Sequence, residues 1–105
     1  MQTDKLTNPI VRSAIQALAD GNADNWFKLF TKDAELYDDG NKMNLHNFFG
    51  KAIGHERFTS IDRVEHDGLH VYGHFHSDQW GDFKTYFKFY INPKGLIYRL
   101  DIGQA

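Results

Sequence analysis

Hydrophobic positions follow two different periods along this chain. Up to about residue 54, apolar residues recur three and four positions apart, as they do on one face of an α-helix. From residue 57 onward, apolar and polar residues alternate with the period of two that is typical of β-strands. The pattern predicts an α+β domain in which three N-terminal helices pack on a strongly curved antiparallel sheet that forms a cone.

The helix boundaries follow from capping residues. The first helix begins at Asn8 and Pro9, an N-cap followed by a residue with preset φ, and ends at Gly21. A second, short helix begins near Asn22 and is predicted to end around residues 31–33. A third covers the apolar positions of residues 45–53.

A short strand is expected between the second and third helices, over residues 34–38, before the turn pair Asp39 and Gly40. Later turns indicate the strand register. The Asp-Gly pair at residues 67–68 predicts a two-residue hairpin turn, which sets Val64 opposite Val71.

Extending this register sets Asp62 opposite Gly73, a glycine expected to let the sheet bend. A three-residue loop over residues 79–81, with its glycine in the left-handed conformation, sets Gly73 opposite Phe87. A last turn at residues 92–95 sets Phe89 opposite Tyr98.

Alternation gives the sheet an apolar face toward the helices and an outer face rich in tyrosine and histidine. The inner positions are Phe58, Val64, Leu69, Val71, Phe75, Phe83, Phe87, Phe89, Ile91, Leu96, Leu100 and Ile102. The outer positions are Arg63, Glu65, His70, Tyr72, His74, His76, Lys84, Tyr86, Lys88, Tyr90, Arg99 and Asp101.

Aromatic residues make up 15% of the chain, and nine residues are Phe, which favours a cavity lined by rings. A filled, Phe-rich core is the alternative. The residues expected to form the walls of a small-molecule pocket are Trp26, Phe30, Phe49, Phe75 and Phe87.

Few polar side chains are expected on the inner face. Counting by alternation, Asp38 points inward, where lost hydration should raise its pKa and make it a proton acceptor. The alternative is that Asp38 bonds the turn that follows it. Asp62 and Tyr98 are the other inward polar groups and are assigned to ligand binding, with an edge role bonding nearby backbone as the alternative for Asp62.

The outer face suggests a second role. Tyrosine-rich surfaces are frequent at interfaces, so a homodimer contact is expected there through His70, Tyr72, His74, Tyr86 and Tyr90. His74 and His76 are spaced as a strand zinc pair would be, but no further ligand can be identified, and no metal site is predicted.

Composition narrows the function further. The net charge is −2 and the basic residues are scattered, which argues against nucleic-acid binding; Cys is absent, and no apolar run predicts a membrane span. We expect one cytoplasmic domain over residues 1–105, with residues 1–7 flexible. Phosphate-binding and nucleophile motifs are absent, so any chemistry is expected to need no cofactor.

The helix order, the stretch of residues 21–38 with Trp26, Lys32, Asp33 and Ala34, and the closing meander resemble the nuclear-transport-factor-2-like (NTF2-like) superfamily. The likeness is to its SnoaL-like and ketosteroid-isomerase-like small bacterial members and covers residues 8–103. The resemblance implies a conical barrel with a pocket under the helices, a hydrophobic ligand, and dimers formed through the sheet.

In ketosteroid isomerases the carboxylate that ends the first strand moves a proton, and it matches Asp38. The tyrosine and aspartate that stabilise the enolate match Ala14 and Phe87, so steroid isomerisation is not expected. The resemblance instead implies a SnoaL-like protein that binds a small hydrophobic molecule, with isomerase, cyclase or hydratase chemistry by Asp38. A non-catalytic homodimeric interaction module with a filled core is the alternative.

Overall fold

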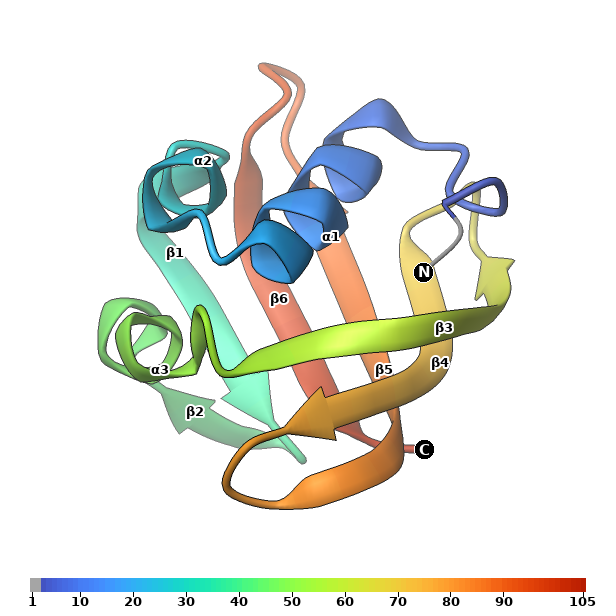
Figure 1. Ribbon diagram of the computed structural model, residues 1–105. Helices are drawn as coiled ribbons and strands as arrows, with labels where there is room; N and C mark the ends of the chain where they lie inside the picture. The colour runs from blue at the N-terminus through green and yellow to red at the C-terminus, as the bar shows by residue number, and fades with distance from the viewer. Residues whose placement is uncertain (1–2) are drawn as a thin grey trace.

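The computed structural model describes residues 3–105, which form three helices and six strands (Figure 1). The elements in chain order are α1 (Pro9–Asp20), α2 (Ala23–Phe27), β1 (Phe30–Asp38), β2 (Asn41–Met43), α3 (Leu45–Ala52), β3 (Glu56–Glu65), β4 (His70–Ser77), β5 (Gly81–Ile91) and β6 (Ile97–Gln104).

One six-stranded sheet curls around the helices, with β3 and the end of β4 crossing in front of the other strands (Figure 1). Its strand order is β2-β1-β6-β5-β4-β3. The predicted α+β cone is confirmed. One pairing differs from the expectation, because β1 and β6 run parallel while all other neighbours are antiparallel. These two strands lie far apart in the sequence, so no hairpin turn imposes their direction.

The first helix has the predicted caps. The Asn8 side chain accepts hydrogen bonds from the backbone N–H groups of Ile10 and Val11, and Gly21 ends the helix with φ of 67°. The second helix is shorter than predicted. It ends at Phe27, and β1 begins already at Phe30, where the chain pairs with β6 instead of continuing the helix.

The predicted turn at residues 67–68 is confirmed, with Val64 opposite Val71. Beyond it the predicted register is wrong, because two irregularities in β3 shift the pairing and set Ile61, not Asp62, opposite Gly73. Gly73 lets β3 approach closely: a Cβ there would collide with the Ser60 carbonyl oxygen.

The three-residue loop before Gly81 is confirmed but spans residues 78–80, so the predicted pairing is wrong by two residues. Gly73 therefore lies opposite Thr85. The predicted pairing across the turn at residues 92–95 is also wrong by two residues, because Phe89 lies opposite Leu100. A shift of two keeps each side chain on its predicted face. An irregularity in the β5–β6 pairing after Tyr90 then turns Tyr98 outward, where it is 45% exposed.

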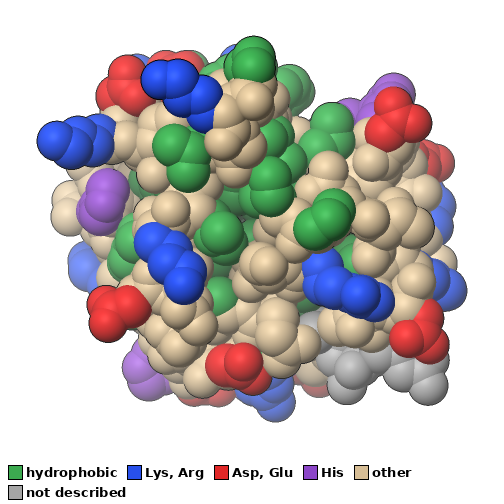
Figure 2. Space-filling model, turned by 90° about the horizontal axis from the view of Figure 1, so that it is seen from above, with side chains coloured by type: hydrophobic (Ala, Val, Ile, Leu, Met, Phe, Trp, Pro, Cys, Tyr) green, Lys and Arg blue, Asp and Glu red, His purple; other side chains and the backbone are tan. Residues whose placement is uncertain are grey.

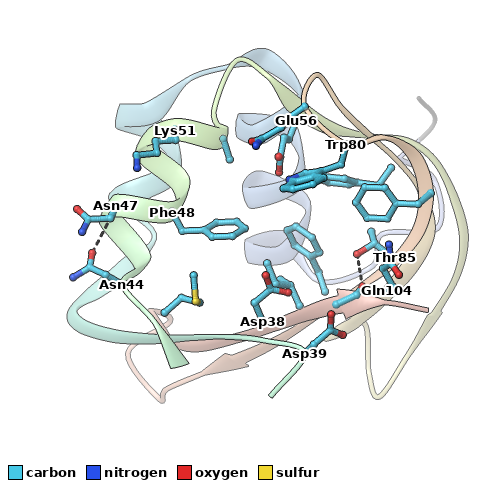
Figure 3. A pocket seen from close by; sticks show the side chains of 18 residues that line it. Asp38, Asp39, Asn44, Asn47, Phe48, Lys51, Glu56, Trp80, Thr85 and Gln104 are labelled. Carbon is cyan, nitrogen blue, oxygen red and sulfur yellow. Dashed lines mark hydrogen bonds between the residues drawn. The ribbon is translucent and has the colours of Figure 1, made fainter. Parts of the chain in front are cut away.

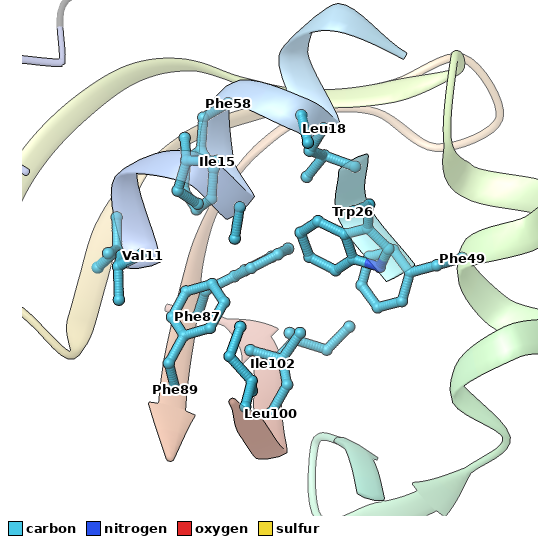
Figure 4. Close-up of a cluster of buried hydrophobic side chains, with 14 of the residues drawn as sticks. Val11, Ile15, Leu18, Trp26, Phe49, Phe58, Phe87, Phe89, Leu100 and Ile102 are labelled. Atoms are coloured by element: carbon cyan, nitrogen blue, oxygen red, sulfur yellow. The ribbon is translucent and has the colours of Figure 1, made fainter. Parts of the chain in front are cut away.

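The core fills the part of the cone beneath α1 and α2 (Figure 4). The Trp26 ring packs 5.0 Å from Phe30 and 4.5 Å from Phe49, between ring centroids. Phe58 and Phe87 continue this packing on the sheet side, 4.9 Å apart. Buried aliphatic residues of α1 close it from above: Val11, Ala14, Ile15, Ala17 and Leu18.

The segment before α1 also contacts the sheet. Leu6 is buried, and the Lys5 ammonium group donates to the backbone carbonyl oxygens of Ile61 and Asp62. The flexibility expected of residues 1–7 stays a prediction, and residues 1–2 lie outside the described part. None of the described helices combines the length and apolar character that crossing a bilayer requires. On the helical side of the molecule, acidic and basic side chains are interspersed (Figure 2).

Candidate functional site

A cavity of about 620 Å³ opens beside the filled core, between α3, the end of β1, the β4–β5 loop and the inner faces of β5 and β6 (Figure 3). It is lined by Asp38, Asp39, Met43, Asn44, Asn47, Phe48, Lys51, Ala52, Glu56, Phe75, Gln79, Trp80, Phe83, Thr85, Phe87, Ile102, Gly103 and Gln104.

Aromatic rings form much of its apolar wall, but only two of the five predicted rings are among them. Phe75 and Phe87 line the cavity as expected. The prediction was wrong for the other three, Trp26, Phe30 and Phe49, which pack against one another in the filled core instead. The sequence identified these rings as inward but could not show which ones would touch each other.

The other aromatic and apolar residues of the wall are Met43 from β2, Phe48 and Ala52 from α3, Phe83 from β5, Ile102 from β6, and Trp80 from the β4–β5 loop. Trp80 is 72% exposed and lies at the cavity's edge (Figure 3). A large exposed indole at the rim of a cavity can pack against a bound ligand.

Thr85 helps keep this part of the cone open. It points inward from β5 between Phe83 and Phe87 and is buried. Its hydroxyl donates a hydrogen bond of 2.5 Å to the Gly103 carbonyl oxygen on β6. A short polar residue therefore occupies an inward position, and the next inward residue on either side along the strand is Phe.

Asp38 lies in the cavity wall at the end of β1, as alternation from Leu36 predicts. Burial raises the pKa of its carboxyl group, and the negative charge of Asp39 raises it further. Asp39, with φ of 49°, makes the turn that follows. A carboxylate that has lost hydration beside apolar rings is a competent proton acceptor near neutral pH.

Glu56, at the start of β3, also lines this cavity and is partly buried like Asp38, and the sequence prediction missed it. Figure 3 shows Asp38 and Glu56 on opposite sides of the hollow. Burial raises the pKa of Glu56. The hydrogen bond from Ser77 lowers this pKa, whereas the negative charge of Asp38 raises it. Glu56 lies two residues before the inward-pointing Phe58, so its side chain points to the same face of β3. Extending the predicted alternation from Phe58 back to residue 56 would have identified it.

A buried serine holds the Glu56 side chain. The Ser77 hydroxyl donates to Glu56 Oε2 at 2.9 Å. The same hydroxyl oxygen accepts hydrogen bonds from the backbone N–H groups of Gln79 and Trp80, at 3.3 and 3.1 Å. Ser77 is 1% exposed, so this arrangement links Glu56 to the loop that carries Trp80.

Two predicted site residues lie outside the cavity. Asp62 points outward because of the irregularities in β3, and its Oδ1 lies 3.4 Å from His74 Nδ1 on the outer side of the sheet. Tyr98 also faces outward, with its ring centroid 6.1 Å from that of Tyr90. Their predicted inward orientation was wrong for the same reason, since an extra residue in a strand interrupts the alternation of side chains at that point.

The outer face is aromatic and charged, as predicted. The Arg99 guanidinium lies 4.3 Å from the Tyr37 ring centroid and 5.2 Å from that of Tyr90, while its Nε donates to Asp101 at 2.8 Å. Nearer β3, the Arg63 guanidinium lies 4.0 Å from the Tyr72 ring centroid.

His74 and His76 do not converge on one point of this face. His76 bridges Asp78 and Asp82 through its two ring nitrogens, at 2.8 and 2.7 Å, while His74 approaches Ser60 and Asp62. Within residues 3–105, no group of three or more metal-ligating side chains is found.

No protein-family model and no curated protein matches this chain. Solved structures do match it. A proposed polyketide cyclase from Sinorhizobium meliloti has a TM-score of 0.76 and 20% identity, over 97% of this chain and 99% of that one. An NTF2-like protein of unknown function from Cytophaga hutchinsonii has a TM-score of 0.75 and 14% identity, over 100% and 95%.

A third match concerns part of a larger protein. The orange carotenoid protein of Anabaena, which binds canthaxanthin, has a TM-score of 0.73 and 20% identity, over 97% of this chain but 37% of that one. Identities this low establish the fold and leave activity open. The chain has the NTF2-like, cystatin-like fold that its sequence resembles.

Proposed function

We propose that this NTF2-like protein binds a small, largely apolar molecule in the cavity, and that Asp38 takes a proton from it. The observation that carries the proposal is the juxtaposition of a hollow of about 620 Å³ with an inward carboxyl group whose pKa burial has raised. Rings of Phe48, Phe83 and Phe87 supply the apolar contact.

The chemistry proposed is cofactor-independent isomerisation, cyclisation or hydration. Each of these begins with proton transfer at carbon or oxygen, and a well-placed general base contributes about 10² to 10⁴ in rate. The similar Sinorhizobium protein is described as a proposed polyketide cyclase. Cyclisation is one of these three reactions, so the similarity supports this choice.

Binding can be tested with 2-methylnaphthalene, an apolar bicyclic probe of suitable size, and measured by thermal shift and by isothermal titration calorimetry. We expect the probe to stabilise the protein, since it binds the folded state alone. Phe48→Ala should weaken binding at least about fivefold, because it removes apolar contact area from the wall.

Phe27→Ala is the matched control. Phe27 is also a partly buried helical Phe, but it stacks on His46, 4.8 Å between ring centroids, outside the cavity. Its substitution should leave probe affinity unchanged. Equal loss of affinity in both variants, or no stabilisation of the wild type, would count against a binding cavity.

Proton transfer can be tested without knowing the natural substrate. The ketone 2-tetralone exchanges its acidic α-hydrogens for deuterium in deuterated water, and NMR follows the exchange. We expect the protein to accelerate this exchange and Asp38→Asn to reduce the acceleration at least about 100-fold. Asp39→Asn, which alters the neighbouring exposed carboxylate, should reduce it far less.

For the outer face we propose contact with a second copy of the chain, through His70, Tyr72, His74, Tyr86 and Tyr90. This face carries both signs of charge, with Arg99 beside Asp101 and Arg63 beside Glu65 at 3.3 Å, so a two-fold axis can bring opposite charges together. Sedimentation velocity should show a dimer. Tyr72→Glu should give a monomer, whereas Lys28→Glu in the α2–β1 connection should not.

A further inference from the structure

The cavity contains few polar groups that are shielded from water. Seven of its polar or charged lining residues are exposed: Asp39, Asn44, Asn47, Lys51, Gln79, Trp80 and Gln104. The three others are Thr85, which is buried, and Asp38 and Glu56, which are partly buried. Chemistry away from bulk water therefore depends on these three side chains.

Thr85 is not free to donate to a ligand, because its hydroxyl hydrogen is directed to the Gly103 carbonyl oxygen. Asp38 and Glu56 remain, on opposite sides of the hollow (Figure 3). Proton abstraction next to a carbonyl group leaves negative charge on the carbonyl oxygen, and a donor aimed at that oxygen lowers the barrier. One carboxyl group as base and the other as acid would meet both needs.

We propose that Glu56, held by Ser77, donates a hydrogen bond from its protonated carboxyl group to an oxygen atom of the bound molecule, while Asp38 takes the proton from carbon. This proposal rests on the proposed function and adds to it that the ligand carries a carbonyl or hydroxyl oxygen at the Glu56 side.

The hydrogen bonds of Ser77 determine which atom of Glu56 can donate. Because the Ser77 oxygen accepts from two backbone N–H groups, its own hydrogen is directed to Glu56 Oε2. Oε1 is left as the oxygen that carries the proton. Ser77 acts as a positioning residue, and the Trp80 N–H bond connects it to the cavity rim.

Protons and electrons balance in this scheme. An Asp38 oxygen takes the hydrogen from carbon, and the C–H electron pair forms the carbon–carbon double bond of an enol while the carbonyl oxygen receives the Glu56 proton. Reketonisation returns the Asp38 proton to carbon and the enol proton to Glu56. Isomerisation results when the proton returns to a different carbon.

The charges around Glu56 favour the protonated acid. Asp38 from β1 and Asp78 from the β4–β5 loop raise its pKa, while His55, before β3, lowers it. His55 Nδ1 lies 3.0 Å from Asp78 Oδ2, so these two groups largely offset one another at Glu56. Lys51, the cationic residue of the cavity lining, is exposed on α3.

A matched pair of probes tests the proposal: 2-acetylnaphthalene and 2-isopropenylnaphthalene differ only by a carbonyl oxygen in place of a methylene group, and neither can donate a hydrogen bond to an ionised carboxylate. Titrations in the Asp38→Asn background remove Asp38 as a source of pH dependence, and neither probe titrates between about pH 5 and pH 8. We expect 2-acetylnaphthalene to bind roughly 5- to 10-fold more tightly than its hydrocarbon analogue at the acidic end. This preference should disappear at the basic end as Glu56 ionises.

Four variants test whether Glu56 is the source of this preference. Glu56→Gln keeps a neutral donor and should retain the 2-acetylnaphthalene preference at every pH, whereas Glu56→Leu should lose it at every pH. Ser77→Ala removes a hydrogen bond that stabilises the ionised carboxylate, so it should move the midpoint of the preference to higher pH. His55→Gln should leave the pH dependence in place.

The two proposals fail differently. If both probes bind equally at every pH, or if Glu56→Gln titrates like its parent, Glu56 is not the donor, and the binding cavity stands. If neither probe binds, the proposed function fails and this inference with it. Thermal melts of each variant identify any that does not fold.

Discussion

The two halves of the cone contrast in what fills them. Under α1 and α2, Trp26 and Phe49 pack ring on ring and are at most 1% exposed. Between α3 and the β4–β5 loop, Thr85 occupies an inward position and two partly buried carboxyl groups, Asp38 and Glu56, face a hollow. The same inner sheet face supplies both halves, so the difference comes from which side chains and helices meet it.

The contrast shows how a small domain can tolerate partly buried acids. Close packing beneath α1 provides the hydrophobic stabilisation on which folding depends. The open half contributes less, so Asp38 and Glu56 can lie there, partly hydrated, without leaving an unpaired charge in a dry core. Stability and proposed chemistry are thereby assigned to different regions.

The largest expected effect is the loss of a core ring. Trp26→Ala should lower the free energy of unfolding by about 3 to 5 kcal/mol, because it leaves a void among close-packed rings. Phe48→Ala, on the hollow side, should cost less than about 2 kcal/mol, since that ring is partly exposed. Urea denaturation followed by circular dichroism measures both, and equal costs would contradict the contrast.

The next effect concerns two buried threonine hydroxyls. Thr85→Val should cost about 1 kcal/mol, because it removes the bond to the Gly103 carbonyl oxygen. Thr31→Val is the matched control: within residues 3–105, the buried Thr31 hydroxyl has no hydrogen-bond partner, so its removal should be neutral or stabilising. Urea midpoints that rank the two variants in the opposite order would refute this prediction.

A smaller effect of opposite sign is expected at the acids. Asp38→Asn and Glu56→Gln should each stabilise the protein at pH 7, by less than about 1 kcal/mol because both groups stay partly hydrated. The folded protein holds these protons at higher pH than the unfolded chain, so ionisation costs stability as pH rises above the ordinary pKa values of 3.8 and 4.5.

The gain should therefore be complete above the raised pKa of each group and vanish below its ordinary value. Melting temperatures of wild type and variants across this pH range would show it. Variants that are less stable than wild type at pH 7 would mean that these carboxylates stabilise the fold, in conflict with the proposed division between the two halves.

The smallest effect is expected outside both halves, at His76. Hydrogen bonds from its ring to Asp82 and Asp78 raise the His76 pKa above 6.5. Its contribution to stability is therefore complete below pH 6.5 and is lost as pH rises through the raised value. His76→Gln should flatten the melting temperature over that range. His46→Gln, whose ring stacks on Phe27, should not.

Several features could be predicted from sequence because their cause is local. The Asn8 cap, the turn at residues 67–68 and the inward direction of Asp38 each depend on neighbouring residues and on strict alternation. Asp62 and Tyr98 were misplaced because pairing irregularities in β3 and after Tyr90 interrupt that alternation, and no residue pattern marks them.

By itself, the sequence determined the order of the helices and of the strands other than β2, the two faces of the sheet and the acid that ends β1, because periodicity and capping act over a few residues. Only the tertiary structure decided which rings fill the core, where the hollow lies and that Glu56 faces Asp38. These outcomes depend on contacts between residues far apart in the chain, whose packing is settled only when the sheet curls around the helices.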